Sequence, residues 1–442
     1  MSPVAPDTPG KVATSSISPS ENGNTVHESH QGASTDGNSW PVDHGWLPWL
    51  QVIGGWILAV NGWGLTNTYG HFQTYYVHHL LPSYSASSIS WIGSLQLFLT
   101  MAFCLPVGIL YDHGHLYSLV IAGTLLEVLG LVGTSFSTNY WQVLVFQGIM
   151  CGSGCGIVAI LTSASVARWF EKRRLWAAGI VISGTSFAGM VYPLMLKSLF
   201  PKIGFAWGTR TLALIILCSN AISLTMLRKR PGNALGKNML EHLKDLPYVF
   251  MILSWLLTMM AAYVPFFYIQ DYALNIGIDQ NMAYTTLVVM NAANFVGRFA
   301  LGKLADRYGG VNTLVPLNIS LIAILLAFRA VSGLAGMLTV TILFGFASGA
   351  IISFQAFAML GVSKDPKSQV GAKMGIGYVC AAFGGLLGNP LSGALEKVGQ
   401  VNAQQRFQGV WFCSAGFMLA STIVLMAVRK MKLGTPWKKG KV

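Results

Sequence analysis

Long apolar stretches separated by short polar segments dominate the chain from residue 44 onward. Residues 44–111 contain no Asp, Glu, Lys or Arg, and residues 113–167 contain only Glu127. A bilayer-spanning helix needs about 20 mostly apolar residues, so each stretch can hold two helices, with turns predicted at 82–88 and 135–139. Eight further stretches can each hold one helix: 175–196, 211–227, 246–270, 280–297, 308–328, 330–363, 374–395 and 407–428. The pattern predicts an all-α integral membrane protein with twelve transmembrane helices.

The composition excludes a soluble enzyme. Of the 442 residues, 53% are apolar and only 10% are charged, against about 25% charged residues in an average soluble domain. If both termini are cytosolic, the predicted inner segments carry 21 of the 28 Lys and Arg residues and the outer segments carry six. Because cytoplasmic loops are enriched in Lys and Arg, we expect cytoplasmic termini, and the same bias explains the net charge of +13 without a nucleic-acid partner. We further expect a plasma-membrane location.

An internal duplication divides the chain. Gly108–Asp112 and Gly302–Asp306 share a Gly-x-x-x-Asp pattern at the ends of predicted helices two and eight, 194 residues apart. At an offset of 197 residues, Gly148 and Gly152 match Gly345 and Gly349, and Tyr192–Pro193 matches Asn389–Pro390. These landmarks predict two six-helix halves, 43–227 and 247–430, which is the parallel-repeat construction of major facilitator transporters.

Three polar segments complete the predicted organisation. Ser, Thr, Pro, Gly and Asn dominate residues 1–42, and such a composition predicts a disordered N-terminal tail on the cytoplasmic side. Residues 228–246 are predicted to form a cytoplasmic linker between the halves, and residues 431–442 a basic cytoplasmic tail.

The two Gly-x-x-x-Asp patterns are candidates for a gate. Asp112, Asp306 and the following Arg307 can cap a helix N-terminus or pair with a base, and such contacts could hold one end of the protein closed. The alternative is that the pattern serves only helix packing and membrane insertion.

Arg298 is the clearest candidate ligand for a solute. Placing a charge inside a bilayer costs free energy, so a charged residue in a span usually has a function. Asn291 and Asn294 lie on the same predicted helix face, and Asn67, late in the first helix, is expected to line the same site. A guanidinium flanked by amides suits a carboxylate. Alternatively, Arg298 extends to the membrane surface or pairs with Asp306.

Glu127 is the other ion inside a predicted span. A buried carboxyl group can carry a coupling proton, or it can simply pair with a neighbouring side chain. All six cysteines fall within apolar stretches without metal-ligand spacing, so we expect neither a metal nor a cofactor.

Several segments together resemble the monocarboxylate porters of the major facilitator superfamily, in particular their fungal branch. These segments are Asp43–Trp46, Tyr69–Tyr76, Ser90–Gln96, Trp169–Arg174 and Asn294–Arg298, continuing to Ala305–Arg307. The resemblance implies a transporter of small carboxylates, often with a proton, in which Arg298 binds the anion. Animal members have Asp at the position of Asn294 and Lys near Thr66–Asn67, and both groups are associated with proton coupling.

The sequence therefore predicts a secondary active or facilitative transporter of a small organic solute, working by alternating access without a partner protein. A monocarboxylate-like anion is the expected solute, and efflux of a fungal secondary metabolite is the alternative. A nutrient sensor built on a transporter fold and a membrane-embedded enzyme are the rival classes.

Overall fold

The computed structural model describes residues 45–84, 86–230, 239–365, 369–396, 407–434 and 440. All regular secondary structure in these ranges is helical. The predicted N-terminal tail lies outside the described residues, as do 231–238 of the predicted linker and most of the predicted basic tail.

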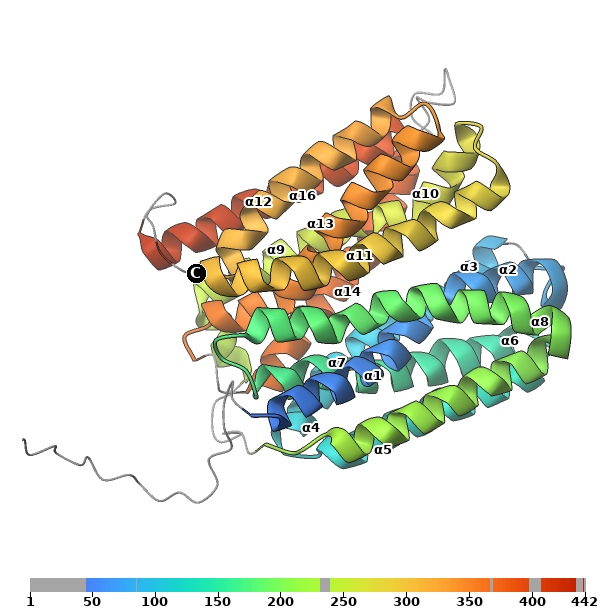
Figure 1. Ribbon diagram of the computed structural model, residues 1–442, viewed down its shortest axis with the longest axis horizontal. Coiled ribbons are helices and arrows are strands. Elements are labelled where there is room, and N and C mark those ends of the chain that lie inside the picture. The colour runs from blue at the N-terminus through green and yellow to red at the C-terminus, as the bar shows by residue number, and fades with distance from the viewer. Residues whose placement is uncertain are drawn as a thin grey trace, which may run out of the picture. The chain divides into compact units, whose positions relative to one another are not determined.

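The described part of the first half consists of six long helical segments, three of which are divided by kinks (Figure 1). In chain order they are α1 (Leu47–Asn67) with α2 (Tyr69–Tyr75) and the π-helix η1 (Tyr76–Leu80); α3 (Ala86–Ala102) with α4 (Cys104–Asp112); α5 (Leu116–Phe136); α6 (Tyr140–Val143) with the π-helix η2 (Leu144–Cys151) and α7 (Gly152–Ala167); and the two parts of α8 (Arg174–Met226). Gly204, with φ +79° and ψ 165°, separates the two parts of α8. Glycine adopts this conformation readily because it has no Cβ.

The second half begins with the short 3-10 helix η3 (Met239–Lys244) and again has six long segments in the described residues. They are α9 (Leu246–Ala262) with α10 (Val264–Asn275); α11 (Gln280–Tyr308); α12 (Gly310–Ala327) with the 3-10 helix η4 (Phe328–Ala330); α13 (Leu334–Val362); α14 (Val370–Glu396); and α16 (Gln408–Leu433). The break between α9 and α10 lies at Tyr263 and Pro265, where proline removes a backbone donor and bends the helix.

Nine of the described helical stretches are long and apolar enough to cross a membrane, and α8, one of the nine, contains two spans. Helices α1 and α11 are not among the nine. These two helices carry Asn67, Asn291, Asn294 and Arg298, the residues predicted to line the solute site. With α1 and α11 included, the described helices form the twelve predicted spans and confirm the fold class.

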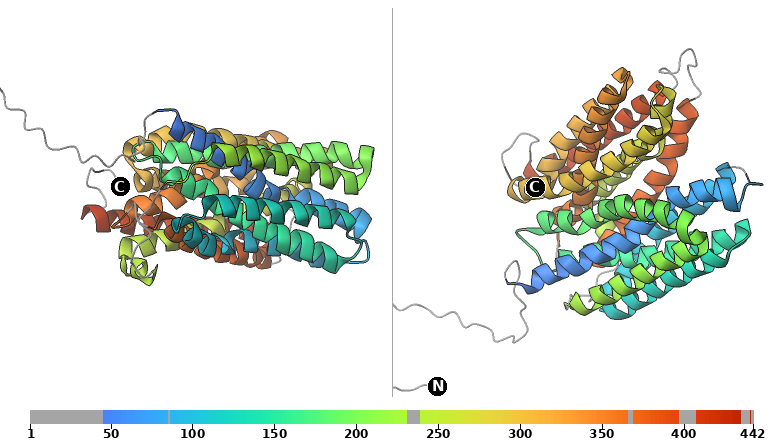
Figure 2. Two further views of the ribbon diagram at one scale, coloured as in Figure 1. Left: turned by 90° about the horizontal axis from the view of Figure 1, so that it is seen from below. Right: turned by 45° about the vertical axis from the view of Figure 1, so that its right-hand side comes forward.

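The two halves contact each other through α4 with α14 and through α8 with α11. The first part of α8 (green) and α11 (yellow-orange) run side by side in Figure 1 and in the right-hand view of Figure 2. A Cβ placed on Gly108 would lie 2.2 Å from the carbonyl oxygen of Gly371, so α4 and α14 approach each other backbone to backbone. Small residues allow this close packing between membrane helices.

The predicted glycine matches make equivalent contacts in the two halves. Gly152 in α7 packs against Gln96 of α3, and Gly349 in α13 packs against Asn294 of α11. The fourth long segment therefore contacts the second in each half, as an internal repeat requires. The exact ends of the two halves and of the linker remain predictions.

Candidate functional site

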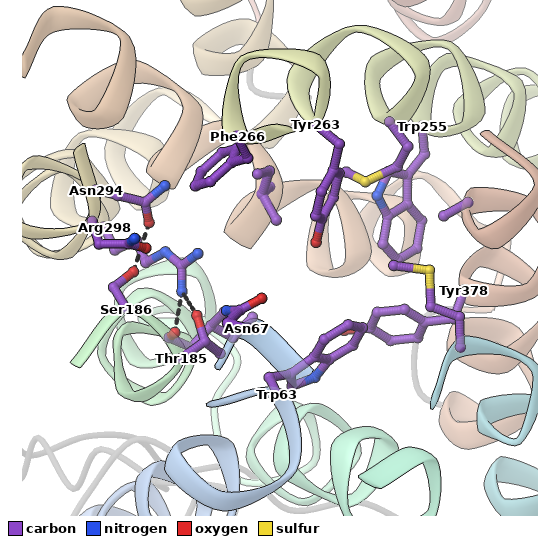
Figure 3. A pocket seen from close by; sticks show the side chains of 16 residues that line it. Trp63, Asn67, Thr185, Ser186, Trp255, Tyr263, Phe266, Asn294, Arg298 and Tyr378 are labelled. Carbon is purple, nitrogen blue, oxygen red and sulfur yellow. Dashed lines mark hydrogen bonds between the residues drawn. The ribbon is translucent and has the colours of Figure 1, made fainter. Parts of the chain in front are cut away.

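A cavity lies between the two halves and has about 660 Å³ of empty space, including space open to solvent (Figure 3). The polar side chains that line it are Asn67, Thr185, Ser186, Asn291, Asn294 and Arg298. The structure thus brings together all four residues that the sequence proposed as solute ligands.

Arg298 is buried, with 5% of its surface exposed. One terminal nitrogen of its guanidinium donates hydrogen bonds to the carbonyl oxygen of Ile182 and to the hydroxyl oxygen of Thr185, both in α8. The Nε of Arg298 has no hydrogen-bond partner within the described ranges, and no carboxylate there forms an ion pair with it. Neither alternative from the sequence holds, because Arg298 does not extend to the surface and Asp306 is bonded elsewhere.

The side-chain amides of the three asparagines differ in how many hydrogen bonds they make within the protein. The side-chain oxygen of Asn294 accepts a 2.8 Å hydrogen bond from Ser186 across the interface between the halves, and its nitrogen donates to Ser348. Asn291 donates to the carbonyl oxygen of Leu287 at 3.0 Å. The amide of Asn67 is exposed and makes no hydrogen bond to the described part of the chain. Asn67 and Arg298 therefore have the most bonding capacity left for a solute.

Aromatic rings form the remaining wall of the cavity, and most of them were missed from the sequence. Trp63, Trp255, Tyr263, Phe266 and Tyr378 line it together with Met101 and Met259. Trp63 and Trp255 lie inside long helices, away from the membrane interface where tryptophan is common. That position is the signal that could have identified them.

Asp112 lies at the end of the helices where α1 begins and α16 ends, which we call the termini-side end. Its carboxylate accepts hydrogen bonds from the backbone N–H groups of Gly371 at 3.0 Å and Ala372 at 2.8 Å, at the start of α14. Arg168 at the end of α7 forms an ion pair with the same carboxylate at 2.5 Å. Asp112 thus connects the first half to the second.

Asp306 makes the corresponding contact in the opposite direction. Its two carboxylate oxygens accept hydrogen bonds, both 2.9 Å, from the N–H groups of Leu175 and Trp176 at the start of α8. The first N–H groups of a helix have no partner within it, so each carboxylate satisfies donors that would otherwise be unbonded. We call these two contacts the Asp112 latch and the Asp306 latch.

Arg307 takes no part in the Asp306 latch. It is exposed, and its guanidinium lies 5.6 Å from the ring centroid of its neighbour Tyr308. Within the described residues, the gating candidates that join the two halves are the two aspartates, and a gating role for Arg307 stays a prediction.

Glu127 is fully buried in the first half and does not line the cavity. One of its oxygens accepts a 3.1 Å hydrogen bond from Asn220, while the other has no partner among the described residues. Asn220 in turn accepts from Asn61 at 2.6 Å, and Asn61 accepts from the hydroxyl of Tyr192 at 2.7 Å. Glu127 therefore belongs to a polar network that joins α5, α1 and both parts of α8.

Comparison with known proteins supports the fold. Residues 49–389 match the family model described as Major Facilitator Superfamily. The chain is 31% identical over 388 residues to the MFS-type transporter dbaD of Emericella nidulans, covering 87% of this chain and 86% of dbaD. It is 30% identical over 390 residues to the Agnestins efflux protein AgnL12 of Paecilomyces divaricatus, covering 87% and 88% of the two chains.

Among solved structures, the chain is similar to FucP, a transporter of this superfamily crystallised in the outward conformation. The TM-score is 0.65 at 17% sequence identity, with 85% of this chain and 98% of FucP covered. At this identity the similarity supports the fold alone.

Proposed function

Because the chain belongs to the Major Facilitator Superfamily, we propose that it transports a small organic anion by alternating access, with Arg298 as the ligand of the anion. Members of this superfamily bind the solute between two halves that rock about it. The solute in this proposal carries a carboxylate or a comparable acidic group.

The observation that carries the proposal is the state of Arg298. A cation buried at a protein interior is normally paired with an anion, and Arg298 lines a cavity without a carboxylate partner among the described residues. Its guanidinium can hold a carboxylate through two parallel hydrogen bonds. Asn67, with its unbonded amide, is placed to add one more.

The proposed direction is export. The relative from Paecilomyces divaricatus is named an efflux protein, and this chain shares 30% of the aligned residues with it. The solute would then be a metabolite made inside the cell, and the protein would act in a membrane that separates the cytosol from the outside.

The Asp112 and Asp306 latches are the proposed gate. Each joins a carboxylate of one half to the first turn of a helix in the other half, and every hydrogen bond of the two latches lies at the termini-side end. Opening of that end requires both to break. With the bias of Lys and Arg toward the same end, the gate would face the cytosol.

Glu127 is the proposed proton carrier. A carboxyl group buried without a cation is stable there only if it can be uncharged for part of the cycle, and its hydrogen-bond network connects it to α1 and α8, which also line the cavity. In this role Glu127 acts at a distance from the solute.

Proteoliposomes loaded with a pH-sensitive dye test the proposal. We expect wild-type protein to take up at least one organic acid saturably, and Arg298→Gln to lose that uptake. Arg329→Gln, which removes an exposed guanidinium stacked on Phe412, is the matched control and should transport normally. Equal transport by Arg298→Gln, or transport of neutral amides in preference to acids, would contradict an anion site at Arg298.

A further inference from the structure

The cavity has two chemically different sides. Figure 3 shows the guanidinium of Arg298, with Thr185 and Asn294 beside it, on one side of the space, and Trp255 and Tyr378 on the opposite side. The Arg298 side offers hydrogen-bond donors and a positive charge, and the opposite side offers aromatic rings.

The rings opposite Arg298 are held in fixed positions. The hydroxyl of Tyr378 lies 3.2 Å from the hydroxyl of Ser163. Its ring packs edge to face against Trp255, with centroids 4.9 Å apart at 62°, and lies 5.7 Å from the ring of Trp63. A side chain that becomes ordered on binding loses conformational entropy, which weakens binding. Rings that are already fixed against one another do not incur this cost. The wall is therefore prepared to receive a flat apolar group.

The rings come from both halves of the protein. Trp63 lies in α1 of the first half, whereas Trp255 and Tyr378 lie in α9 and α14 of the second. A solute held against this wall contacts both halves at once, as does Arg298, whose guanidinium is bonded to α8.

We propose that the solute is an organic acid with a planar aromatic body, its acidic group on Arg298 and its ring system against Trp255, Tyr378 and Trp63. This inference rests on the anion site proposed above and adds a substrate class to it. A short aliphatic acid can occupy the Arg298 side but does not reach the aromatic wall. An aromatic acid fills both sides, and aromatic pairs contribute more than the buried area of the rings alone.

Isothermal titration calorimetry on the purified full chain distinguishes the two parts of this proposal. Three probes of nearly the same size are used: 2-naphthoate, its saturated decahydro analogue and neutral 2-naphthamide. The ratio of naphthoate to decahydro affinity reports the aromatic wall, and the ratio of naphthoate to naphthamide affinity reports Arg298.

We expect naphthoate to bind about two- to ten-fold more tightly than the decahydro acid, which is the size of an aromatic pairing preference. Trp255→Leu should abolish this preference, and Trp255→Phe should retain it because phenylalanine restores a ring. Trp91→Leu is the matched control, since Trp91 is 63% exposed and does not line the cavity. Should Trp255→Leu fail to fold, Trp63→Leu removes a different ring of the same wall.

Three results would each contradict a defined part of the reasoning. If the acid–amide preference is present but naphthoate and the decahydro acid bind equally, the aromatic wall is not a solute site and the anion site stands. If acid and amide bind equally and Arg298→Gln changes nothing, the anion site itself is wrong. If monodisperse wild-type protein binds none of the three probes, both proposals are wrong.

Discussion

Substitution of Asp306 by Asn tests the proposed gate with a minimal change in shape. The two oxygens of Asp306 accept hydrogen bonds from the N–H groups of Leu175 and Trp176. Asn keeps one acceptor oxygen but places an NH₂ group, itself a donor, opposite the other N–H. The change also removes a negative charge from the N-terminus of α8, where the helix dipole favours one.

The magnitude follows from these two losses. A hydrogen bond to a charged group contributes about 1.5–3 kcal/mol, and the charge–dipole interaction about 0.3–1 kcal/mol. The closed termini-side end of Asp306→Asn should therefore be less stable by roughly 2–4 kcal/mol. At about 1.4 kcal/mol per factor of ten, opening becomes at least about 30-fold more frequent.

Hydrogen–deuterium exchange followed by mass spectrometry measures this opening without an attached probe. The amides of Leu175 and Trp176 lie in the first turn of α8, where no intrahelical carbonyl accepts from them, so their protection depends on Asp306. We expect peptides from this turn to exchange at least about 30-fold faster in Asp306→Asn. Asp279→Asn removes the same charge near the other end of α11 and should leave this exchange unchanged.

The decisive peptide is the one at the start of α14, which is protected by Asp112 and not by Asp306. If the two latches open together as one gate, Asp306→Asn accelerates exchange there as well. Acceleration confined to α8 would mean local fraying of a helix end and would refute the gate.

Further substitutions test other features of the molecule. Gly371→Ala should prevent closure of the termini-side end and reduce transport at least ten-fold in vesicles, because a Cβ on Gly371 would lie 2.2 Å from the carbonyl oxygen of Gly108. Glu127→Gln keeps an acceptor for Asn220 and should abolish solute-dependent acidification in dye-loaded vesicles while solute exchange continues; unchanged acidification would exclude Glu127 as the proton carrier. Gly204→Ala should lower the free energy of unfolding by about 1–3 kcal/mol in thermal or denaturant unfolding, because φ is +79° and ψ is 165° there, a combination that residues with a Cβ avoid, while no atom lies within 4 Å of the new methyl group.

Most of the fold could be predicted from the sequence because the bilayer imposes one simple requirement. Each span must satisfy its own backbone hydrogen bonds, so length and apolar character identify the helices. The matching aspartates at 112 and 306 identified the repeat because each must meet a helix start in the opposite half. The kinks could be predicted only in part, since Pro265 marks the break between α9 and α10 whereas the π-helices η1 and η2 carry no such residue.

The site could be predicted only on its polar side. Arg298 and the asparagines are conspicuous in a sequence because polar groups are rare in membrane spans. Trp255 is unusual only in lying far from the ends of its helix, and Tyr378 is not unusual at all, because an aromatic residue in a span is usually in contact with lipid or with other helices. Their place in the cavity depends on how α9 and α14 rotate against the other half, which no pattern within a single helix determines.

The position of Arg298 suggests how solute binding and gating are linked. Its guanidinium is bonded to Ile182 and Thr185, so the side chain already ties α11 to α8 across the interface. The same two helices form the Asp306 latch at the termini-side end. An anion that occupies the guanidinium competes with Thr185 for its donors, and it thereby weakens one tie between α11 and α8 while adding its own contacts to both halves. A ligand shifts a conformational equilibrium only through such differential contacts, and α11 carries both the proposed solute ligand, Arg298, and the proposed gate residue, Asp306.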